Sequence, residues 1–531
     1  MASLLMVYVL LAPMAFGALD ASSRHRWYNV VGSFSSLLAL AGLWLVGHPV
    51  VIFLPFLPVS YGSQPLGLLL ASVTTLVWFA ISIFSRHYQR SSSRFIRLFG
   101  LSVAGAISCF LARDFLAFLL GFELVAVTSH GLVAHDPSPT AQKAARLYHR
   151  LGDVSSATLI VGLAILGLQH GTLAYAQLTA IPLGMSLLLS ISFAIKAGAF
   201  PFHFWLPKAH PVAPSPGSAL LSGILIKIGA YGLLQVASLT ASPAPYGLIV
   251  IGMALVTMSL GVVMALLQHD AKRMLAYHSV SQMGYILLGV GLWAFERNTL
   301  GLGGAVLHMI NHAIFKSALF LICGSAMLAA NTTAIYSLGS MRKVFGYATP
   351  IVLFPALGIA GIPGLSGYIS KTVLHNALAS AKLPPNLYRI ADLVFILVAF
   401  GTVCSFTKFN WFVFFADRKS GHSAQSASKA EVIAIGLLSI TVLLLGVFPQ
   451  PVLTALASEV NALGASWPSP LNLFNSHALE SAWLTLGGGL TLYFICYYTG
   501  LFHLHPPQLT WENLLKFLNH DLEPRKMKLR K

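Results

Sequence analysis

The sequence has little charge. Asp, Glu, Lys and Arg together make up 9% of its 531 residues, whereas a soluble domain carries about 25%. Hydrophobic residues make up 56%, and the mean hydropathy is +0.77. This composition excludes a water-soluble enzyme or binding domain. It predicts an all-α polytopic membrane protein whose helices pack against one another within lipid.

Cysteine is also scarce. Cys109, Cys323, Cys404 and Cys496 stand alone in apolar runs, without a CxxC pair. Neither a disulfide framework nor an iron–sulfur site is therefore expected. The sequence also lacks a GxGxxG motif after a strand, a P-loop, a GxSxG elbow and an HExxH motif. We expect no catalytic site, metal or cofactor in this chain, and any electron transfer would take place in another subunit.

The net charge is +17. Nucleic-acid binding would need a contiguous basic face with aromatic residues. Lys and Arg instead form short clusters between apolar runs, which is typical of the positive-inside rule for membrane proteins. No nucleic-acid partner is expected.

Apolar runs of about 20 residues, the length that spans a bilayer, occur fifteen times. The first run is interpreted as a span, because no basic segment precedes it as in a signal peptide. With fifteen spans, every basic cluster falls on the same side. This places the N-terminus outside and the C-terminus in the cytoplasm of a bacterial or archaeal cell. The runs are 2–19, 29–46, 65–84, 97–113, 114–134, 153–169, 183–205, 217–240, 246–268, 274–294, 300–329, 350–379, 388–416, 431–449 and 481–503.

Two of these runs are interrupted. Lys196 is followed by Pro201 in one run, and Pro363 precedes Lys371 in another. Interrupted segments at matching places in two halves indicate an inverted repeat of five helices, with a broken helix in each copy. The predicted regions are N-terminal helices at 1–94, a core at 95–420 with repeats at 95–240 and 246–416, C-terminal helices at 421–503, and a basic tail at 504–531. In the tail, TWENLLKFLNHDL predicts either a short interfacial helix or a partly ordered end.

Several ionisable residues lie inside the apolar runs. A lysine at mid-membrane costs roughly 2.5–3.5 kcal/mol, so such residues mark function by default. Three of them, His308, His312 and Lys316, have the spacing i, i+4, i+8 and therefore share one helix face. A carboxylate, lysines and histidines in one bundle predict a proton relay. Its members are Glu123, Lys196, Lys227, His308, His312, Lys316 and Lys371.

Structural alternatives exist for several of these residues. A Glu–Lys pair can simply hold two helices together, and Lys316 can snorkel or form a structural pair. His308 and His312 could bind a metal, but no third ligand is nearby. His203 and His210, in the proline-rich break, are either local hydrogen-bonding residues or relay members.

A second set of charged residues lies at span ends, where they form interfacial ion pairs or serve only as surface salt bridges and topology signals. These residues are Arg150, Asp153, Asp270, Lys272 and Arg273.

Four segments resemble one superfamily, the proton-conducting antiporter-like membrane subunits. These subunits occur in complex I (NADH:quinone oxidoreductase), in multisubunit Na⁺/H⁺ antiporters and in group 4 membrane-bound hydrogenases. The resemblance covers about 95–420. It lies in KAGAFPFHFWLPKAHPVAPSPGSALLSGILIKIGAYGLL, HDAKRMLAYHSVSQMGYILLG, HMINHAIFKSALFLICG and GIPGLSGYISK.

The resemblance implies a role for each matching residue. Glu123 matches the glutamate of the fifth span, Lys196 and Lys227 match the lysines of the seventh and eighth, and Lys371 matches the lysine of the twelfth. His308 and His312 match the histidines of the eleventh span. Two positions depart from the pattern, since Ser222 replaces a histidine of the distal complex I subunit and Lys371 replaces a glutamate of the middle ones. The 504–531 tail is too short for the long lateral helix of the distal subunit.

The resemblance implies a proton-translocating subunit of a complex I-like or hydrogenase-like redox-driven complex. A proton would enter from the cytoplasm, pass Lys227 and His312, and leave by Lys371, while Glu123 pairs with Lys196. The alternatives are a subunit of a multisubunit Na⁺/H⁺ antiporter, a proton-driven coupling subunit for a partner such as an inorganic-carbon uptake protein, and a non-conducting homologue. The expected partners are other membrane subunits, including antiporter-like neighbours, with protons or Na⁺ as the transported ion.

Overall fold

The structure is a computed structural model. It describes residues 1–22, 27–47, 50–53, 58–86, 88, 92–178, 180–417, 426–462, 465–468 and 471–504. The helix expected in the 504–531 tail lies outside these residues from 505 onwards, as do the basic residues Arg24, Arg26, Arg90, Arg418 and Lys419.

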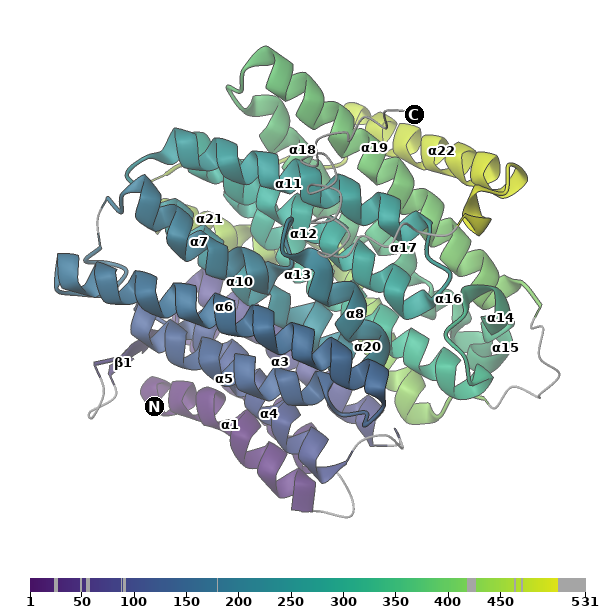
Figure 1. The fold of residues 1–531 in the computed structure, drawn as a ribbon, viewed down its shortest axis with the longest axis horizontal. Coiled ribbons are helices and arrows are strands. Elements are labelled where there is room, and N and C mark those ends of the chain that lie inside the picture. Colours follow the sequence, from purple (N-terminus) through teal and green to yellow (C-terminus); the bar gives the residue numbers. More distant parts are fainter. Residues whose placement is uncertain are drawn as a thin grey trace, which may run out of the picture.

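The described residues form a helical bundle with one small hairpin (Figure 1). The first helices and the hairpin are α1 (Ala2–Ser22), α2 (Tyr28–Val46), β1 (Val51–Phe53), β2 (Ser60–Gly62) and α3 (Pro65–Ser85). The two strands are antiparallel, with Ile52 opposite Tyr61. Asp114 fixes the hairpin to the bundle, because its carboxylate accepts hydrogen bonds from the amide and hydroxyl of Ser60 at 2.6 and 2.7 Å.

The first half of the core contains long helices and a broken segment. The elements are α4 (Ser93–Leu111), α5 (Phe115–Val133), α6 (Pro139–His170), α7 (Leu183–Ala197), the 3₁₀ turn η1 (His203–Trp205), α8 (Leu206–Val212), α9 (Ser215–Leu220), the π-helical segment η2 (Leu221–Leu225) and α10 (Ile226–Leu239).

The second half repeats this alternation of long and broken helices. The elements are α11 (Pro243–Leu266), α12 (Ala271–Glu296), α13 (Thr299–Ala330), α14 (Ile335–Leu338), α15 (Met341–Phe345), η3 (Gly346–Ala348), α16 (Thr349–Val352), α17 (Phe354–Ala360), α18 (Ser366–Ser380), α19 (Pro385–Asn410) and the π-helical segment η4 (Trp411–Phe415).

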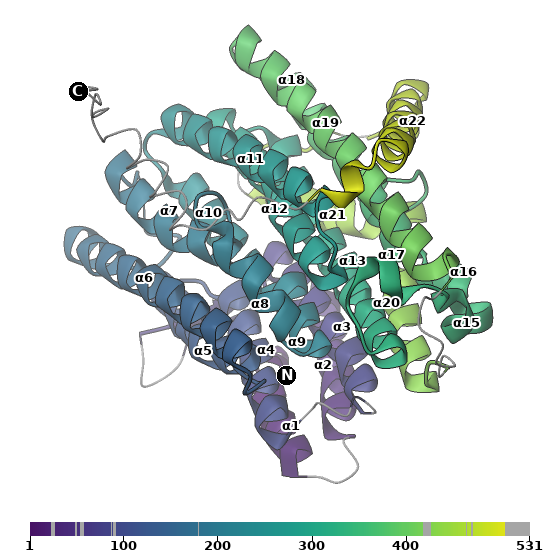
Figure 2. The same cartoon turned by 45° about the vertical axis from the view of Figure 1, so that its right-hand side comes forward.

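Three helices and a short turn follow the core: α20 (Lys429–Val447), α21 (Gln450–Ala462), α22 (Ser476–Tyr498) and η5 (Leu501–His503). α13 lies at the centre of the bundle in both Figure 1 and Figure 2, and it is buried from Gly301 to Ala326. α22 lies beside α19 in both views.

The bundle has two ends, which we name the hairpin end and the basic end. At the hairpin end, isolated bridges join Tyr61 to Ala112 and Ile181 to Thr240. At the basic end, Lys272 donates to the carbonyl of Ala213 at 2.7 Å. Figure 1 shows the hairpin at the left and α14 and α15 at the right.

Each of the fifteen predicted runs coincides with a helix or a group of broken helices. Eleven helices of the described residues are long and apolar enough to cross a membrane, or twelve if Met341–Val352 and Phe354–Ala360 form one bent span. α7 has only 15 residues. The protein is a multi-span membrane protein, whereas the count of fifteen, the side of each terminus and the inverted repeat stay predictions.

Candidate functional site

The lysines and histidines expected in the relay are buried inside the bundle. Their exposed fractions are 8% or less for Lys196, Lys227, His308, His312, Lys316 and Lys371. Glu123 is half-buried. Because a buried polar group needs a partner, the contacts of these side chains define what the site can do.

Lys196 lies in the last turn of α7, where the helix breaks. Gly198 follows the helix in the left-handed conformation (φ 66°), and its amide donates to the carbonyls of Ala194 and Ile195. Glycine adopts this conformation at little cost. The indole of Trp205 donates to the carbonyl of Ile195 at 2.9 Å. The carbonyls that lose their helical hydrogen bonds at the break therefore accept from other donors, as backbone groups within a membrane must.

Glu123 and Lys196 line one cavity of about 110 Å³. They form no ion pair within 4 Å, since the salt bridges of the described residues involve other groups. One oxygen of Glu123 is buried and has no hydrogen-bond partner among the described residues. The Lys196 ammonium lies 5.3 and 5.9 Å from the rings of Phe122 and Tyr148, within cation–π range. The expected direct pair is therefore replaced by two charges that share a cavity.

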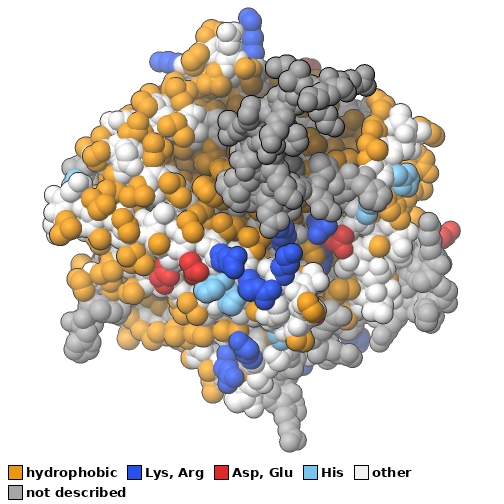
Figure 3. Space-filling view, viewed as in Figure 1, with side chains coloured by type: hydrophobic (Ala, Val, Ile, Leu, Met, Phe, Trp, Pro, Cys, Tyr) orange, Lys and Arg blue, Asp and Glu red, His pale blue; other side chains and the backbone are white. Residues whose placement is uncertain are grey.

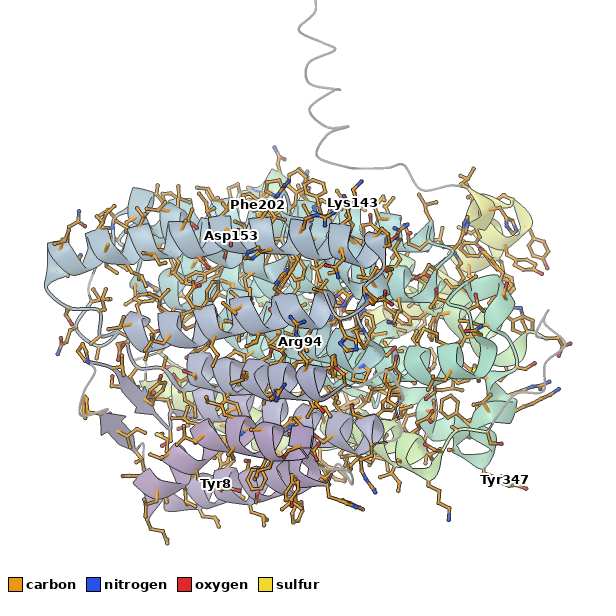
Figure 4. The ribbon with its side chains drawn as sticks, turned by 60° about the horizontal axis from the view of Figure 1, so that its bottom comes forward. Tyr8, Arg94, Lys143, Asp153, Phe202 and Tyr347 are labelled. Carbon is orange, nitrogen blue, oxygen red and sulfur yellow. The ribbon has the colours of Figure 1, made fainter. Side chains whose placement is uncertain are left out.

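The same cavity reaches the surface of α6. His149 and Asp153 line it, lie 3.4 Å apart, and are 59% and 61% exposed. Figure 3 shows a mainly hydrophobic face on which acidic, basic and histidine side chains gather near the centre. In Figure 4, Lys143 and Asp153 lie on one side of the bundle and Tyr8 lies on the opposite side. The cavity that contains Glu123 and Lys196 therefore opens at a polar patch on α6.

Lys227 follows the π-helical segment. Its ammonium donates to the carbonyl of Ser222 at 2.5 Å. The Ser222 hydroxyl lies 2.7 Å from that of Ser279 on α12, and Ser279 donates to the carbonyl of Leu275 at 3.1 Å. Lys316 on α13 donates to the same carbonyl. Two serine hydroxyls and two carbonyls, those of Ser222 and Leu275, therefore lie between Lys227 and Lys316.

His308, His312 and Lys316 follow one another along α13. The rings of the two histidines are 6.3 Å apart. His308 lies 2.9 Å from the hydroxyl of Ser370, through Nδ1, and 3.0 Å from the side-chain oxygen of Gln282, through Nε2. Neither ring nitrogen of His312 has a hydrogen-bond partner among the described residues. Hydrogen bonds thus fix the His308 ring, whereas His312, which lies between His308 and Lys316 along α13, has no hydrogen bond to either ring nitrogen among the described residues.

Lys371 lies beside the second break. α17 ends at Gly361, which is left-handed (φ 91°), and the Lys371 ammonium donates to the carbonyl of Ile359 at 2.8 Å. Lys371 directly follows Ser370, the partner of His308. Hydrogen bonds therefore form two groups, one that links Lys227 to Lys316 and one that holds His308 beside Lys371, and His312 lies on α13 between them.

The residues expected at the interface have other contacts. Asp153 faces His149. Asp270 caps α12 by accepting from the Arg273 amide at 2.8 Å, and it also accepts from the Thr333 hydroxyl. Lys272, expected at the surface, is 2% exposed and donates to Ala213. Arg150 is exposed on α6. Asp270 thus serves as a helix cap, and Lys272 is buried and does not lie at the surface.

Sequence reasoning missed Lys408 and His278. Lys408 is fully buried and donates to the carbonyls of Leu266 and Gln268 at 3.0 and 2.8 Å. His278 is fully buried, and its Nε2 lies 2.6 Å from the Ser405 hydroxyl. Both lie inside apolar runs, in SFTKFN and AYHSVS. The cost of burying such groups, which identified the other lysines, would have found them.

A short C-terminal segment covers Lys408. The Phe502 ring lies 4.8 Å from its ammonium. The Phe502 carbonyl accepts from Tyr336 at 3.0 Å and lies 2.9 Å from His269 Nε2. Burial raises the pKa of Tyr336 to about 12, so the phenol keeps the proton that it donates. The basic end of α19 is therefore closed by backbone and aromatic contacts.

The described residues contain no group of three or more His, Cys, Asp or Glu side chains that could hold a metal ion.

His203 and His210 are buried, and both nitrogens of His210 have no hydrogen-bond partner in the described parts of the chain. His210 stacks on Phe320 of α13 at 4.8 Å. His210 therefore makes no local hydrogen bond through its ring within the described residues, and a place for it in a relay stays a prediction.

Comparison with known proteins identifies the family. Residues 112–396 match the family profile described as NADH:quinone oxidoreductase/Mrp antiporter, transmembrane. The chain belongs to this family. The match contains Glu123, the two breaks and Lys371, so the site described above lies inside the segment that defines this antiporter-like family.

The antiporter-like family includes subunits of different complexes. The chain is 28% identical over 470 residues to hydrogenase-4 component B of Escherichia coli (strain K12), covering 83% of this chain and 67% of that protein. It is 29% identical over 401 residues to a Na⁺/H⁺ antiporter subunit of Alkalihalophilus pseudofirmus, covering 72% and 78%. Among solved structures it resembles a chain of the membrane-bound sulfane sulfur reductase, an archaeal respiratory membrane complex, with a TM-score of 0.78, 26% identity, and coverage of 92% and 84%.

Proposed function

We propose that this chain is the proton-translocating membrane subunit of a complex I-like or hydrogenase-like redox-driven complex. Protons pass from the basic end to the hairpin end through Lys227, Lys316, His312, His308 and Lys371. Glu123 and Lys196 control this transfer from the side. The positive-inside rule assigns the basic end to the cytoplasm.

One observation carries this proposal: the row of buried lysines, serines and histidines that leads from the π-helical segment of the first half to the break of the second half. Lys227 and Lys316 are linked through Ser222, Ser279 and the Leu275 carbonyl. His308 then reaches Ser370, next to Lys371. Within the described residues, these lysines donate to backbone carbonyls, which can hold an ammonium without taking its proton.

The chemistry needs no cofactor in this chain. An ammonium donates a proton to a neighbouring imidazole and becomes an amine, which can then accept the next proton. His312 suits the intermediate position, because both of its nitrogens are unpaired among the described residues. Glu123 provides the negative charge that favours the ammonium form of Lys196 across their shared cavity.

The test uses the whole complex in membrane vesicles, with proton uptake followed by a pH-sensitive dye. Replacing Lys316 or Lys371 with Ala should lower the initial pumping rate by about 100-fold or more, since each removes a proton-carrying group. Lys208→Ala is the matched control, because Lys208 is exposed on α8. Pumping at the wild-type rate by both relay variants would overturn the proposal.

A second candidate function is Na⁺/H⁺ exchange without redox chemistry, which the 29% identity to the Na⁺/H⁺ antiporter protein favours. The same vesicles separate the two functions. Redox-driven pumping requires the electron donor of the complex and proceeds without Na⁺, whereas exchange requires Na⁺ and proceeds without a donor. The co-purifying subunits give an independent answer, because iron–sulfur subunits accompany only the redox-driven complex.

A further inference from the structure

A small cavity extends from Lys371 toward the hairpin end. The space open to the centre of a water molecule is about 60 Å³, and one water needs roughly 10–15 Å³ by this measure. Its walls come from α18, α19 and α22. Polar groups from α18 and α22 line it: Lys371, His375, Asn376, His477, Ser481 and Thr485. The cavity is thus large enough and polar enough to hold water.

His375 is the next residue on the same face of α18, one turn beyond Lys371. Its Nε2 lies 2.8 Å from Oδ1 of Asp392 on α19. The two side chains are 24% and 30% exposed, whereas Lys371 is 8% exposed. Exposure therefore increases along the line from Lys371 to His375 and Asp392, as it does along a route that leaves the bundle.

α22 forms the remaining wall. His477, Ser481 and Thr485 have the spacing i, i+4, i+8, so they share one helix face, and all three line the cavity. The opposite face is apolar and exposed, with Trp483 at 65% and Leu490 at 42%. Three polar residues of the first half of α22 thus lie on the face that meets the Lys371 cavity.

Two glycines hold α22 close to α19. A Cβ at Gly488 would lie 2.5 Å from the Phe400 ring, and one at Gly489 would lie 2.4 Å from Cβ of Val403. Real Cβ atoms do not approach so closely, so Gly489 cannot carry a side chain in this packing, and a side chain at Gly488 would displace the Phe400 ring. α22 lies outside residues 112–396, the part of the chain that matches the family profile. Its contribution to the cavity is therefore additional to the segment that defines the family.

We propose that α22 completes a proton route from Lys371 to the hairpin end, through water in this cavity and the His375–Asp392 pair, and past His477. The Lys371 ammonium gives its proton to water, and water gives one to Nδ1 of His375. The Nε2 proton of the imidazolium then passes to Asp392 and to bulk water, which leaves the imidazole with its proton on Nδ1. Exchange with water, in which Nε2 takes up a proton as Nδ1 releases one, restores the starting tautomer, and the relay reprotonates Lys371. This inference rests on the proposed function, since it supplies the exit of the same relay.

The first experiment measures pumping by the whole complex in vesicles. His375→Ala should slow pumping by about tenfold or more, and added imidazole should restore most of the rate. Rescue by imidazole reports a proton-carrying role, which a purely structural pair would not show. If Lys371→Ala abolishes pumping while His375→Ala and Asp392→Asn pump at the wild-type rate, the exit route is wrong and the relay stands. Wild-type pumping by Lys371→Ala would instead remove the relay itself.

The second experiment tests water access without changing the relay. Ser481→Cys and Thr485→Cys are treated with a membrane-impermeant thiol reagent from the hairpin side, and Trp483→Cys is the control on the same helix. A thiol reacts as thiolate in water and is protected in apolar surroundings, so Ser481→Cys should be labelled about tenfold faster than the control. The native cysteines are 7% exposed or less and give the background. Equal labelling of all three variants would overturn the proposal.

Discussion

The two helix breaks of the core hold their lysines in different ways. Lys196 lies before its break, in the last turn of α7, and shares a cavity with the Glu123 carboxylate. Lys371 lies after its break, in α18, and donates to the carbonyl of Ile359 at the end of α17. Both breaks use a left-handed glycine, with φ 66° at Gly198 and 91° at Gly361.

This difference separates two roles. A carboxylate can lose its charge or move, so the environment of Lys196 can change during a cycle. A backbone carbonyl at a helix end keeps its partial negative charge, so the environment of Lys371 is fixed. Lys196 at the first break is therefore suited to control the rate of proton transfer, and Lys371 at the second break is suited to pass the proton onward. Four predictions, from the largest expected effect to the smallest, test this comparison.

The largest expected effect concerns the glycines. A Cβ at Gly198 would lie 2.0 Å from a methyl carbon of the buried Leu206, whereas a Cβ at Gly361 meets nothing closer than 3.5 Å. Gly198→Ala should lower the free energy of unfolding by about 3 kcal/mol or more, from backbone strain and overpacking. Gly361→Ala should cost about 1–2 kcal/mol, from backbone strain alone. Thermal midpoints of the purified complex measure both, and equal losses would contradict the comparison.

The next effect concerns the carboxylate. Glu123→Gln should slow pumping by about tenfold, because removing an opposite charge near a buried ammonium changes its free energy by more than about 1.4 kcal/mol. Glu296→Gln is the control, since Glu296 accepts from the Lys382 amide at the hairpin end, away from the relay. The measurement is dye-reported pumping. An unchanged rate in Glu123→Gln would mean that Lys196 is not controlled by this acid.

A smaller effect is expected at the link between the halves. Ser279→Ala removes the hydroxyl between Ser222 and the Leu275 carbonyl. One hydrogen bond is worth about 1 kcal/mol, so pumping should slow by about fivefold. Ser439→Ala is the matched control, because the Ser439 hydroxyl is buried without a hydrogen-bond partner in the described part of the chain. Equal rates for the two variants would show that transfer bypasses Ser279.

The smallest effect concerns the closed basic end. Tyr336→Phe removes the hydrogen bond to the Phe502 carbonyl and should cost at most about 1 kcal/mol, seen as faster proteolysis after α22. Burial raises the pKa of Tyr336 from 10.0 to about 12. Because the pKa of Tyr336 is higher in the folded than in the unfolded protein, the stability linked to its protonated phenol is complete below about pH 10. This stability is lost as the pH rises toward about 12. Equal proteolysis of wild type and variant at neutral pH would contradict it.

The sequence predicts the helical class and most of the site, because burying a lysine in lipid is costly and visible in an apolar run. Lys196, Lys227 and Lys371 are found in this way. The burial of Lys272 is not predictable, because only the packing of α12 against the end of α8 produces it. The separation of Glu123 from Lys196 likewise depends on the side chains between them. Local sequence contains no information on such tertiary distances.

The residues that α22 turns toward the bundle restrict changes in its length. His477, Ser481, Thr485, Gly489, Tyr493 and Cys496 all lie on one stripe of this helix, facing the Lys371 cavity at its start and α19 further along. Each residue turns a helix by about 100°. Deleting one residue near Gly487 would rotate the polar residues out of phase with the packed half, whereas a whole turn would preserve their direction. The number of residues between the polar half and the packed half of α22 therefore determines whether both halves face the bundle at once.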